Sequence, residues 1–330
     1  MTPRENLLCA LHHQPHDWTP CFLSDVAIAG FGALPGPSIE KGGMRGGPDG
    51  FGVNWVTPSS GGGASIPEPG KFLLSDITRW KTDVHIPDVK SFDWQADADL
   101  YLGNVDRTQQ VVDFGMGNGI FERLAALMGF ENALMALYTD PEAVNDFFTA
   151  LTEYKMKMVD EIVKAYHPDT ITNYDDIAME RGPFMSPDTY RTLIKPHHKR
   201  LNDHIRSRGV LPIQHTCGKC DMLVEDFIET GAQAWTSVQP TNDICGILDR
   251  YGDRFTIIGG MDTNGAAAIT ADIPLLAEEV HRCIDTYGKY NSYIFFGFVL
   301  VNSLDPAEIG AKIGPMIGEC IQYSHRVAGK

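Results

Sequence analysis

The chain has 330 residues, which fits one large α/β domain or two smaller ones. Hydrophobic residues make up 43% and charged residues 21%, a composition typical of a folded globular protein rather than a disordered one. The formal net charge of -16 arises from 43 acidic and 27 basic residues, and no run of lysine and arginine alternates with aromatic residues. Such a surface repels a phosphate backbone, so we expect no nucleic-acid partner.

Seven cysteines are scattered along the chain, and residues 1–6 lack the apolar segment of a signal peptide. No apolar run is long enough to span a bilayer, so we expect no membrane partner. Together these features predict a cytoplasmic protein with reduced thiols.

Short apolar runs alternate with longer amphipathic segments, most regularly beyond residue 169. In chain order the predicted strands are residues 19–23, 110–114, 170–174, 210–214, 234–238, 255–259 and 293–297. An eighth strand would have to lie near residues 51–55, where the pattern is poor. Strands that alternate with helices predict parallel βα units. Eight such units would close a (β/α)8 barrel, and an open doubly wound sheet is the alternative.

Three helix starts are marked by a capping residue followed by proline, namely Asp140-Pro141, Ser186-Pro187 and Asp305-Pro306. After the first of these, apolar residues recur with helical spacing from Val144 to Val163. The three signals therefore predict helices that begin at these prolines.

The segment from about residue 40 to 70 is rich in glycine, with Gly42-Gly43, Gly46-Gly47 and Gly61-Gly62-Gly63. It contains neither a Gly-x-Gly-x-x-Gly turn that opens a helix nor a Gly-Lys-Ser/Thr sequence, so it supports nucleotide binding only weakly. We interpret it as an insertion or a lid near the mouth of the fold.

His215 and Cys217 follow a predicted strand, where residues of a parallel α/β protein face the site. Their spacing in an extended chain points both side chains to the same side. Imidazole nitrogen and thiolate suit zinc, although a buried cysteine beside a hydrogen-bonded histidine is the simpler alternative. Cys220 completes a Cys-x-x-Cys with Cys217 and is a candidate for a further zinc ligand or for a redox pair, but no thioredoxin-like context surrounds it.

Acidic residues follow another predicted strand. Asp175 and Asp176 come directly after residues 170–174, and we expect one of them to face the site. Both are candidate catalytic groups together with His215, while capping a helix or pairing with Arg181 is the alternative role. Glu180 is a candidate metal ligand. Candidate substrate-binding residues are Asp25, Asp113, Glu180, Gln239 and Asp262.

The motifs that follow these strands resemble those of the uroporphyrinogen decarboxylase superfamily. The matching stretches are residues 175–187, with an acidic pair and a Gly-Pro-x-x-Ser-Pro helix start, and residues 214–218, 238–240 and 259–263. Their order and spacing resemble the superfamily over most of residues 121–310. The resemblance implies a single-domain TIM barrel over residues 1–330, with the glycine-rich segment as an insertion.

Two branches of the superfamily differ at the first strand. True uroporphyrinogen decarboxylases carry an arginine-rich segment there to hold substrate carboxylates, whereas residues 23–30 contain no arginine and do contain Asp25. The cobamide-dependent methyltransferases resemble this chain in having His-x-Cys on a barrel strand. By that resemblance His215 and Cys217 are zinc ligands, and a corrinoid arrives on a separate protein.

The third ligand of that branch is a cysteine after the last strand, and its place falls at Phe298 or Val299. Cys220, Glu180 or Asp175 would therefore have to complete the zinc site, or His215 acts as an acid or base without metal.

The resemblance thus implies a corrinoid-dependent methyltransferase. Its expected reaction moves a methyl group between a small methylated compound, such as a methyl ether in O-demethylation, a thiol or an amine, and a cobalamin-type cobamide on a partner corrinoid protein, with zinc assisting. The alternatives are a carboxy-lyase resembling uroporphyrinogen decarboxylase and a non-catalytic ligand-binding barrel. The sequence leaves a homodimer open.

Overall fold

The computed structural model describes residues 1–31, 34, 38–40, 46–57, 65–299 and 305–329. Its main sheet has seven strands within these residues, each parallel to its neighbour. In sheet order they are β1 (Val26–Gly30), β5 (Val111–Met116), β6 (Thr170–Tyr174), β9 (Leu211–His215), β10 (Ala234–Val238), β11 (Thr256–Gly260) and β12 (Tyr293–Phe296).

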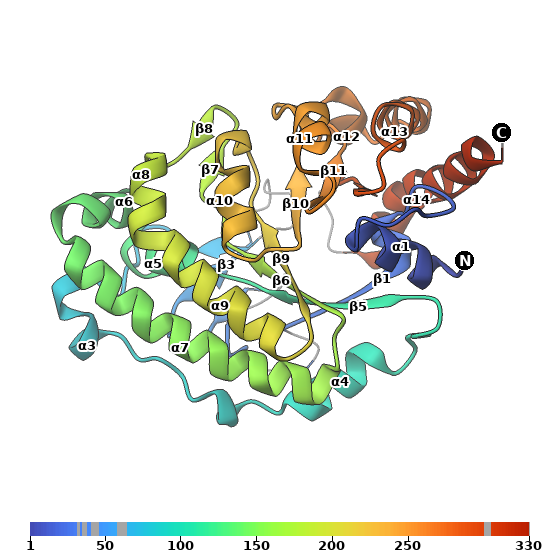
Figure 1. The fold of residues 1–330 in the computed structure, drawn as a ribbon. Helices are drawn as coiled ribbons and strands as arrows, with labels where there is room; N and C mark the ends of the chain where they lie inside the picture. Colours follow the sequence, from blue (N-terminus) through green and yellow to red (C-terminus); the bar gives the residue numbers. More distant parts are fainter. Residues whose placement is uncertain (32–33, 35–37, 41–45, 58–64, 300–304, 330) are drawn as a thin grey trace.

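The two edges of this sheet meet through the segment that precedes β1. Cys21 forms a parallel bridge with Phe295 of β12, and the Phe295 backbone N–H donates to the Pro20 carbonyl at 2.9 Å. Cys21 then leads through helix α2 (Phe22–Asp25) into β1. The sheet therefore curls back on itself in a barrel-like α/β fold (Figure 1).

The strand predictions from residue 110 onward are confirmed to within two residues, but two earlier ones are wrong. The predicted strand at residues 19–23 ends in helix α2, and the strand is β1, which follows it. The predicted eighth strand near residues 51–55 overlaps β3 (Asn54–Val56), which belongs to a separate antiparallel sheet with β2 (Gly47–Pro48) and β4 (Ile66–Pro67).

Helix α1 (Pro3–Leu11) closes the end of the barrel where the strands begin. The carbonyls of Leu11 and Ala10 accept hydrogen bonds from Gln233 and Thr256, at the starts of β10 and β11. Apolar residues from six strands pack with α1 in one cluster that includes Val26, Val111, Ile213, Ala234, Ile258 and Ile294. Ligands must therefore approach at the opposite, C-terminal ends of the strands.

Helices cover the outside of the sheet, and α7 and α9 lie side by side along one face (Figure 1). The longer helices are α4 (Trp94–Leu102), α5 (Ile120–Met128), α6 (Phe130–Thr139), α7 (Pro141–Tyr166), α9 (Lys195–Ser207), α10 (Val224–Glu229), α11 (Ile244–Tyr251), α12 (Ala266–Thr270), α13 (Ile273–Tyr287) and α14 (Pro306–Ala328). Short ones are α3 (Trp80–Asp83), α8 (Pro187–Thr189), η2 (Ile77–Arg79), η3 (Val89–Ser91), η4 (Tyr190–Ile194) and η5 (Asp221–Leu223). None of the described helices is long and apolar enough to cross a membrane.

The three predicted helix starts are confirmed, because α7, α8 and α14 begin at their prolines. Ser186 and Asp305 accept hydrogen bonds from the backbones of their helices, as N-caps do. Asp140 does not, since its carboxylate accepts from the Thr139 hydroxyl instead.

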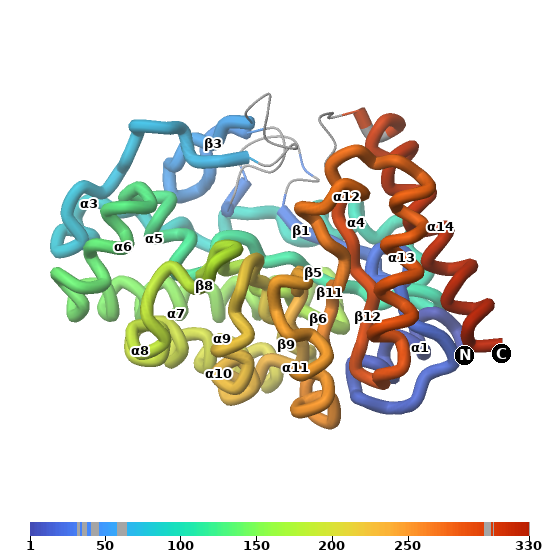
Figure 2. Tube along the Cα trace, turned by 90° about the horizontal axis from the view of Figure 1, so that it is seen from above, coloured from blue at the N-terminus to red at the C-terminus, as the bar shows by residue number. Residues whose placement is uncertain are grey.

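The antiparallel sheet is attached to α5 by buried charges. Arg123 of α5 is fully buried, and its guanidinium donates to Glu40 and, at 2.6 Å, to Asp49. Breaking a buried pair leaves an uncompensated charge, so this contact fixes the sheet beside α5 and α6 (Figure 2). Gly42-Gly43 and Gly61-Gly62-Gly63 of the predicted lid lie outside the described residues.

Candidate active site and metal centre

Neighbouring strands β6 and β9 carry the central groups of the candidate site. Asp176 follows β6, whereas His215 ends β9 and Cys217 comes two residues later. Nε2 of His215 lies 3.7 Å from the Cys217 sulfur and 3.9 Å from Asp176 Oδ1. One ligand atom from each residue lies within 4.8 Å of the other two. The three side chains therefore converge on one point.

The spacing of His215 and Cys217 fits a tetrahedral zinc ion, whereas Asp176 Oδ1, 3.9 Å from His215 Nε2, would have to move about half an ångström closer to ligate the same ion. Zinc–sulfur and zinc–nitrogen bonds of about 2.3 and 2.1 Å place the two ligand atoms about 3.6 Å apart. The observed separation between Cys217 and His215 is 3.7 Å. Three protein ligands leave one coordination position for a substrate atom, which is the arrangement of catalytic zinc sites.

Burial controls the charge of this cluster. It raises the pKa of the Cys217 thiol to about 12, and the Asp176 carboxylate adds to the rise. Burial also lowers the pKa of His215, so its imidazole is neutral and can offer a lone pair to a metal. A bound cation would favour the Cys217 thiolate by compensating its negative charge.

His215 is held by a close ring contact rather than by a hydrogen bond at Nδ1 from a described residue. Its ring centroid lies 4.2 Å from that of Tyr174, the residue paired with it across β6 and β9. Nδ1 is buried and has no hydrogen-bond partner among the described residues. The tilted ring contact with Tyr174 therefore helps to orient Nε2 toward Cys217 and Asp176.

Asp175, a predicted catalytic group, points away from this cluster. It is fully buried, and its carboxylate accepts from the Glu122 backbone N–H at 2.9 Å and lies 2.8 Å from His198 Nε2. A Cβ on Gly119 would approach the Asp175 side chain to 2.1 Å, so only glycine fits where α5 begins. The geometry gives Asp175 the role of holding the N-terminus of α5.

The two proposed completing ligands, Cys220 and Glu180, lie outside the cluster. Cys220 is fully buried, and its backbone N–H donates to Asn242 Oδ1 at 2.8 Å. Glu180 is exposed in the turn between β7 (Ala178–Met179) and β8 (Gly182–Pro183). Asp176 lies with His215 and Cys217 instead, whereas the third candidate, Asp175, does not, and the identity of the completing ligand stays a prediction.

The place of the family's third ligand also contributes nothing to the cluster. Phe298 is 44% exposed, whereas Val299 is fully buried. Neither side chain can ligate a metal, as the sequence predicted.

Asp25 and Asp113 are not at the strand ends that face the site. Asp25 precedes β1, so it lies at the closed end of the barrel, where it accepts from Ser24 and the Cys21 backbone. Asp113 lies within β5 and is fully buried. These positions do not favour the predicted role in substrate binding for either residue.

Gln239 and Asp262 lie at strand ends but are engaged with neighbouring loops. Gln239 accepts from the Gly218 backbone at 3.0 Å and donates to Thr263 at 2.5 Å, so it ties together loops after three strands. Asp262 is exposed and accepts from the Asn264 backbone at 3.0 Å. Their roles in substrate binding stay predictions.

Ser237 and Asn118 line the site region but were missed in the sequence. The Ser237 hydroxyl lies 3.4 Å from the Cys217 sulfur, at a φ of 69° where the register between β10 and β11 shifts. Asn118 follows β5, with a φ of 50°, and its amide nitrogen is buried without a described partner. An asparagine between Gly117 and Gly119 after a strand is the signal that could have identified it.

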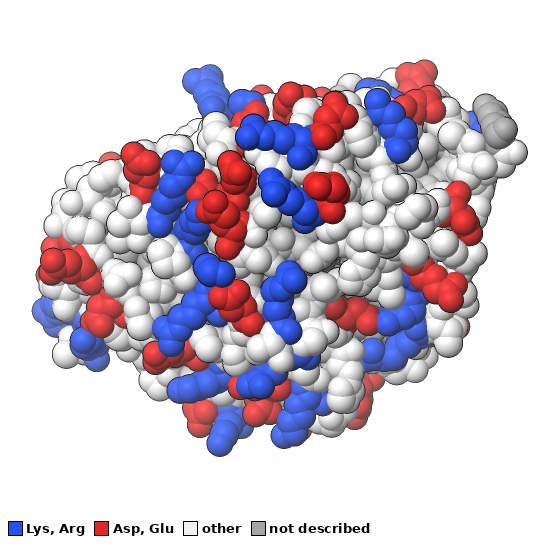
Figure 3. Space-filling model, viewed as in Figure 1, with Lys and Arg blue, Asp and Glu red and all other residues white. Residues whose placement is uncertain are grey.

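On the face that carries α7 and α9, the described residues form no cluster comparable to that of Asp176, His215 and Cys217. Acidic and basic side chains are interspersed over it (Figure 3). Many pair with each other, as Arg200 does with Glu153 and Arg208 with Asp160. Such exposed pairs contribute little to stability and leave no single-sign patch for a partner.

Comparisons with known proteins show the family of the chain and a likeness in fold. The family model described as "Uroporphyrinogen decarboxylase (URO-D)" matches residues 44–310. A solved structure titled methyltransferase from Methanosarcina mazei is 14% identical and has a TM-score of 0.66, with 98% of this chain and 99% of that chain covered. A D-allulose 3-epimerase from Methylomonas sp. is 13% identical over 68% of this chain and 76% of its own, but its TM-score of 0.30 carries no argument. No curated protein matches the sequence.

Proposed function

Because the chain belongs to the uroporphyrinogen decarboxylase family, we propose that it is a methyltransferase within that family. It moves a methyl group between a small methylated compound and a cobamide carried by a partner corrinoid protein. Zinc held by Asp176, His215 and Cys217 would supply Lewis-acid chemistry to the heteroatom that bears the methyl group.

The convergence of a carboxylate, an imidazole and a thiol at two strand ends is the observation that carries this proposal. The likeness in fold to the Methanosarcina methyltransferase supports it. A decarboxylase for a substrate with many carboxylates needs cationic side chains to hold them. The described residues that line the cavity beside Asp176 include neither lysine nor arginine.

The side chains around the cluster prepare it for this chemistry. The Cys217 backbone N–H donates to Asp176 Oδ1 at 2.7 Å and so fixes the carboxylate next to the thiol. Ser237 lies within hydrogen-bonding distance of the Cys217 sulfur, and its hydroxyl can donate to a thiolate. Burial keeps His215 neutral. The site is therefore arranged before any substrate arrives.

Metal analysis of the purified protein tests the zinc part. We expect about one zinc per chain in the wild type and a loss of most of it in Cys217→Ala and Asp176→Ala, because each removes one of three ligands. Cys220→Ala is the matched control and should keep its zinc, since Cys220 lies outside the cluster. Equal, negligible zinc in all four proteins would remove zinc from the proposal.

Methyl transfer to free cob(I)alamin tests the activity, with a methyl ether, a methyl thioether and a methylamine as donors and absorbance as the readout. We expect transfer from at least one donor class and a loss of two or more orders of magnitude in Cys217→Ala, because loss of a hydrogen-bond partner of a metal ligand already costs about 10- to 100-fold and loss of the ligand itself costs at least as much. Consumption of uroporphyrinogen without any methyl transfer would overturn the proposal in favour of decarboxylation.

A further inference from the structure

A cavity of about 430 Å³ opens beside Asp176, between α5, the start of α6 and the antiparallel sheet. Its apolar lining is formed by Trp55, Ile66, Phe72, Phe121, Phe130 and Phe184. Ile66, Phe72 and Phe130 are 41%, 50% and 47% exposed. Large apolar side chains gathered at an opening indicate a binding site, because scattered exposure is the norm elsewhere on a protein surface. We call this space the aromatic cavity.

The walls of the aromatic cavity are fixed by contacts among its own rings. Phe130 meets Phe184 edge to face, with centroids 4.8 Å apart and an interplanar angle of 85°. Phe121 lies 6.1 Å from Phe130 at 76°. The Trp55 indole N–H donates to Asp49 at 2.9 Å, and Asp49 is in turn bound to buried Arg123. A rigid aromatic wall of this kind favours a flat apolar ring.

One polar group in the aromatic cavity lacks a partner. Asn118 lines it and is 5% exposed, and its amide nitrogen forms no hydrogen bond within the described residues. A buried donor without an acceptor is unfavourable, so this amide is suited to an oxygen atom of a ligand. The left-handed backbone of Asn118, with a φ of 50°, is a strained conformation of the kind found at ligand sites.

The charges at the aromatic cavity disfavour an anionic ligand. Asp176 and Glu122 both line it, and no lysine or arginine does among the described residues. A ligand carboxylate would therefore face acidic groups without a compensating cation. Asp176 also belongs to the cluster with His215 and Cys217, so the aromatic cavity adjoins the candidate metal centre.

We propose that the aromatic cavity binds a neutral aromatic compound that carries an oxygen substituent, with the ring among Phe121, Phe130 and Phe184 and the oxygen at the Asn118 amide. An aryl methyl ether has this chemistry, and naming it as the methyl donor rests on the proposed function. The aromatic cavity, of about 430 Å³, is large enough for such a ligand. A cavity of about 150 Å³ already accepts benzene, and typical ligand pockets begin near about 300 Å³.

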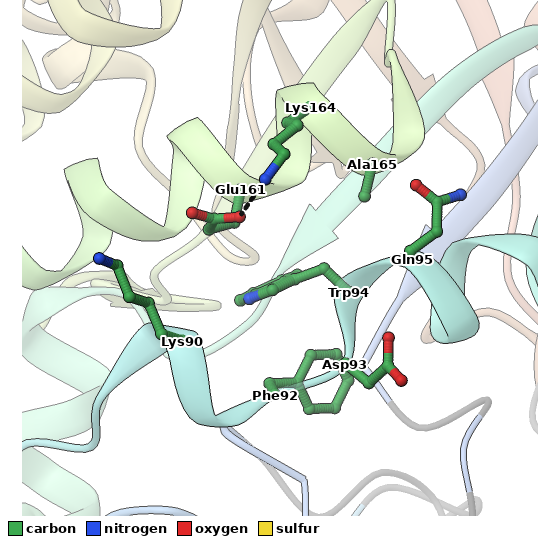
Figure 4. A pocket seen from close by; sticks show the side chains of 8 residues that line it. All are labelled: Lys90, Phe92, Asp93, Trp94, Gln95, Glu161, Lys164 and Ala165. Carbon is green, nitrogen blue, oxygen red and sulfur yellow. Dashed lines mark ion pairs between the residues drawn. The ribbon is translucent and has the colours of Figure 1, made fainter.

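A second groove, of about 320 Å³, supplies a control for this assignment. Its lining side chains come from η3, α4 and α7 and the residues next to them, and none lies at the C-terminal end of a strand (Figure 4). Glu161 and Lys164 pair there at 3.7 Å, and the Trp94 indole donates to the Val89 carbonyl. Gln95 is exposed at its edge, so it tolerates a large replacement.

Calorimetric binding of anisole, toluene and 4-methoxybenzoate to the full chain tests the proposal. Ala125→Trp fills the aromatic cavity and should weaken anisole binding by at least about tenfold, whereas Gln95→Trp fills the other groove and should leave it unchanged. Asn118→Ala should weaken anisole by about tenfold and leave toluene unchanged, because toluene has no oxygen to accept the amide hydrogen. Circular dichroism and thermal unfolding establish that each variant is folded.

Three results would overturn the proposal: anisole binding that survives in folded Ala125→Trp, equal effects of Asn118→Ala on anisole and toluene, or tighter binding of 4-methoxybenzoate than of anisole. A change of oligomeric state in Ala125→Trp would also overturn it, by assigning the surface to a second copy. Methyl transfer from aliphatic donors without any anisole binding would remove this inference and keep the proposed function. Specific anisole binding without methyl transfer from any donor would keep this inference and remove the proposed function.

Discussion

Asp113 in β5 is a buried carboxyl group whose hydrogen-bond partners are the hydroxyls of Thr170 and Thr172. No cation pairs with it among the described residues, and burial raises its pKa to about 7. In the unfolded chain an aspartate titrates near pH 4, at about 3.9. The folded state therefore binds this proton more tightly. Stability from this group is present below about pH 4 and is lost as the pH rises to about 7.

Asp113→Asn should remove this pH dependence, because the amide cannot ionise and its oxygen can still accept from a threonine hydroxyl. A shift of about three pKa units corresponds to of the order of 4 kcal/mol. Urea unfolding from pH 4 to 8 should therefore show the wild type losing several kcal/mol relative to the variant. Asp262→Asn, at an exposed site, should track the wild type. Parallel curves for wild type and Asp113→Asn would contradict the prediction.

At the scale of elements, the N-terminus of α5 depends on Asp175 and its contact with α9. Asp175 accepts from the first turn of α5 and contacts His198, which also lies 3.3 Å from the Tyr190 hydroxyl. Asp175→Ala would leave buried helix N–H groups and an imidazole unpaired. We expect it to lower the free energy of unfolding by about 3 kcal/mol, the cost of breaking a buried pair.

Substitution of the adjacent Asp176 should have the opposite effects, namely a loss of zinc with little loss of stability. Asp176→Ala removes a half-exposed carboxylate that holds no helix, so it should lose zinc while destabilising the protein by about 1 kcal/mol or less. Urea unfolding in the presence of a chelator, combined with metal analysis, separates the two effects. Loss of zinc in a well-folded Asp175→Ala with Asp176→Ala unaffected would reverse our assignment of the pair.

Asp175 and Asp176 also show how far the site can be predicted from the sequence. His215 and Cys217 could be predicted because alternation along an extended strand puts them on one side. Adjacent Asp175 and Asp176 point in different directions, and only tertiary packing decides that Asp176 faces the cluster. Asn118 carries no signal beyond its flanking glycines, because its role depends on the cavity that distant segments build.

The strands, too, could be predicted only where the local sequence pattern determines them. Those from residue 110 onward were predictable because buried parallel strands give continuous apolar runs. The first strand was misplaced because the apolar pair Phe22-Leu23 lies in a four-residue helix. The strand that follows, β1, is formed by its pairing with β5. Local pattern does not contain that pairing.

At the scale of the whole molecule, α1 closes one end of the barrel, so the proposed partner protein would have to dock at the C-terminal ends of the strands. Asp176, Glu180 and Asp262 lie at that end. Two basic residues are there too, namely the exposed Arg181 beside Glu180, and Lys219, whose ammonium group is paired with Asp221 at 2.7 Å. With a net charge of -16 over the chain, this end favours a partner with a basic docking face.

If the partner is a corrinoid protein, as proposed, its reaction should depend on salt in a way that free cobalamin does not. Raising NaCl from low concentration to about 0.5 M should slow methyl transfer to the protein-bound cobamide roughly tenfold, because screening removes the attraction that steers docking. Glu180→Lys should slow that reaction at low salt, whereas Glu153→Lys on α7, away from the strand ends, should not. Transfer to free cobalamin should stay constant throughout, since that small acceptor presents no docking face. A rate with the corrinoid protein that ignores both salt and Glu180→Lys would mean that shape and apolar contact, rather than charge, direct the partner to this end of the barrel.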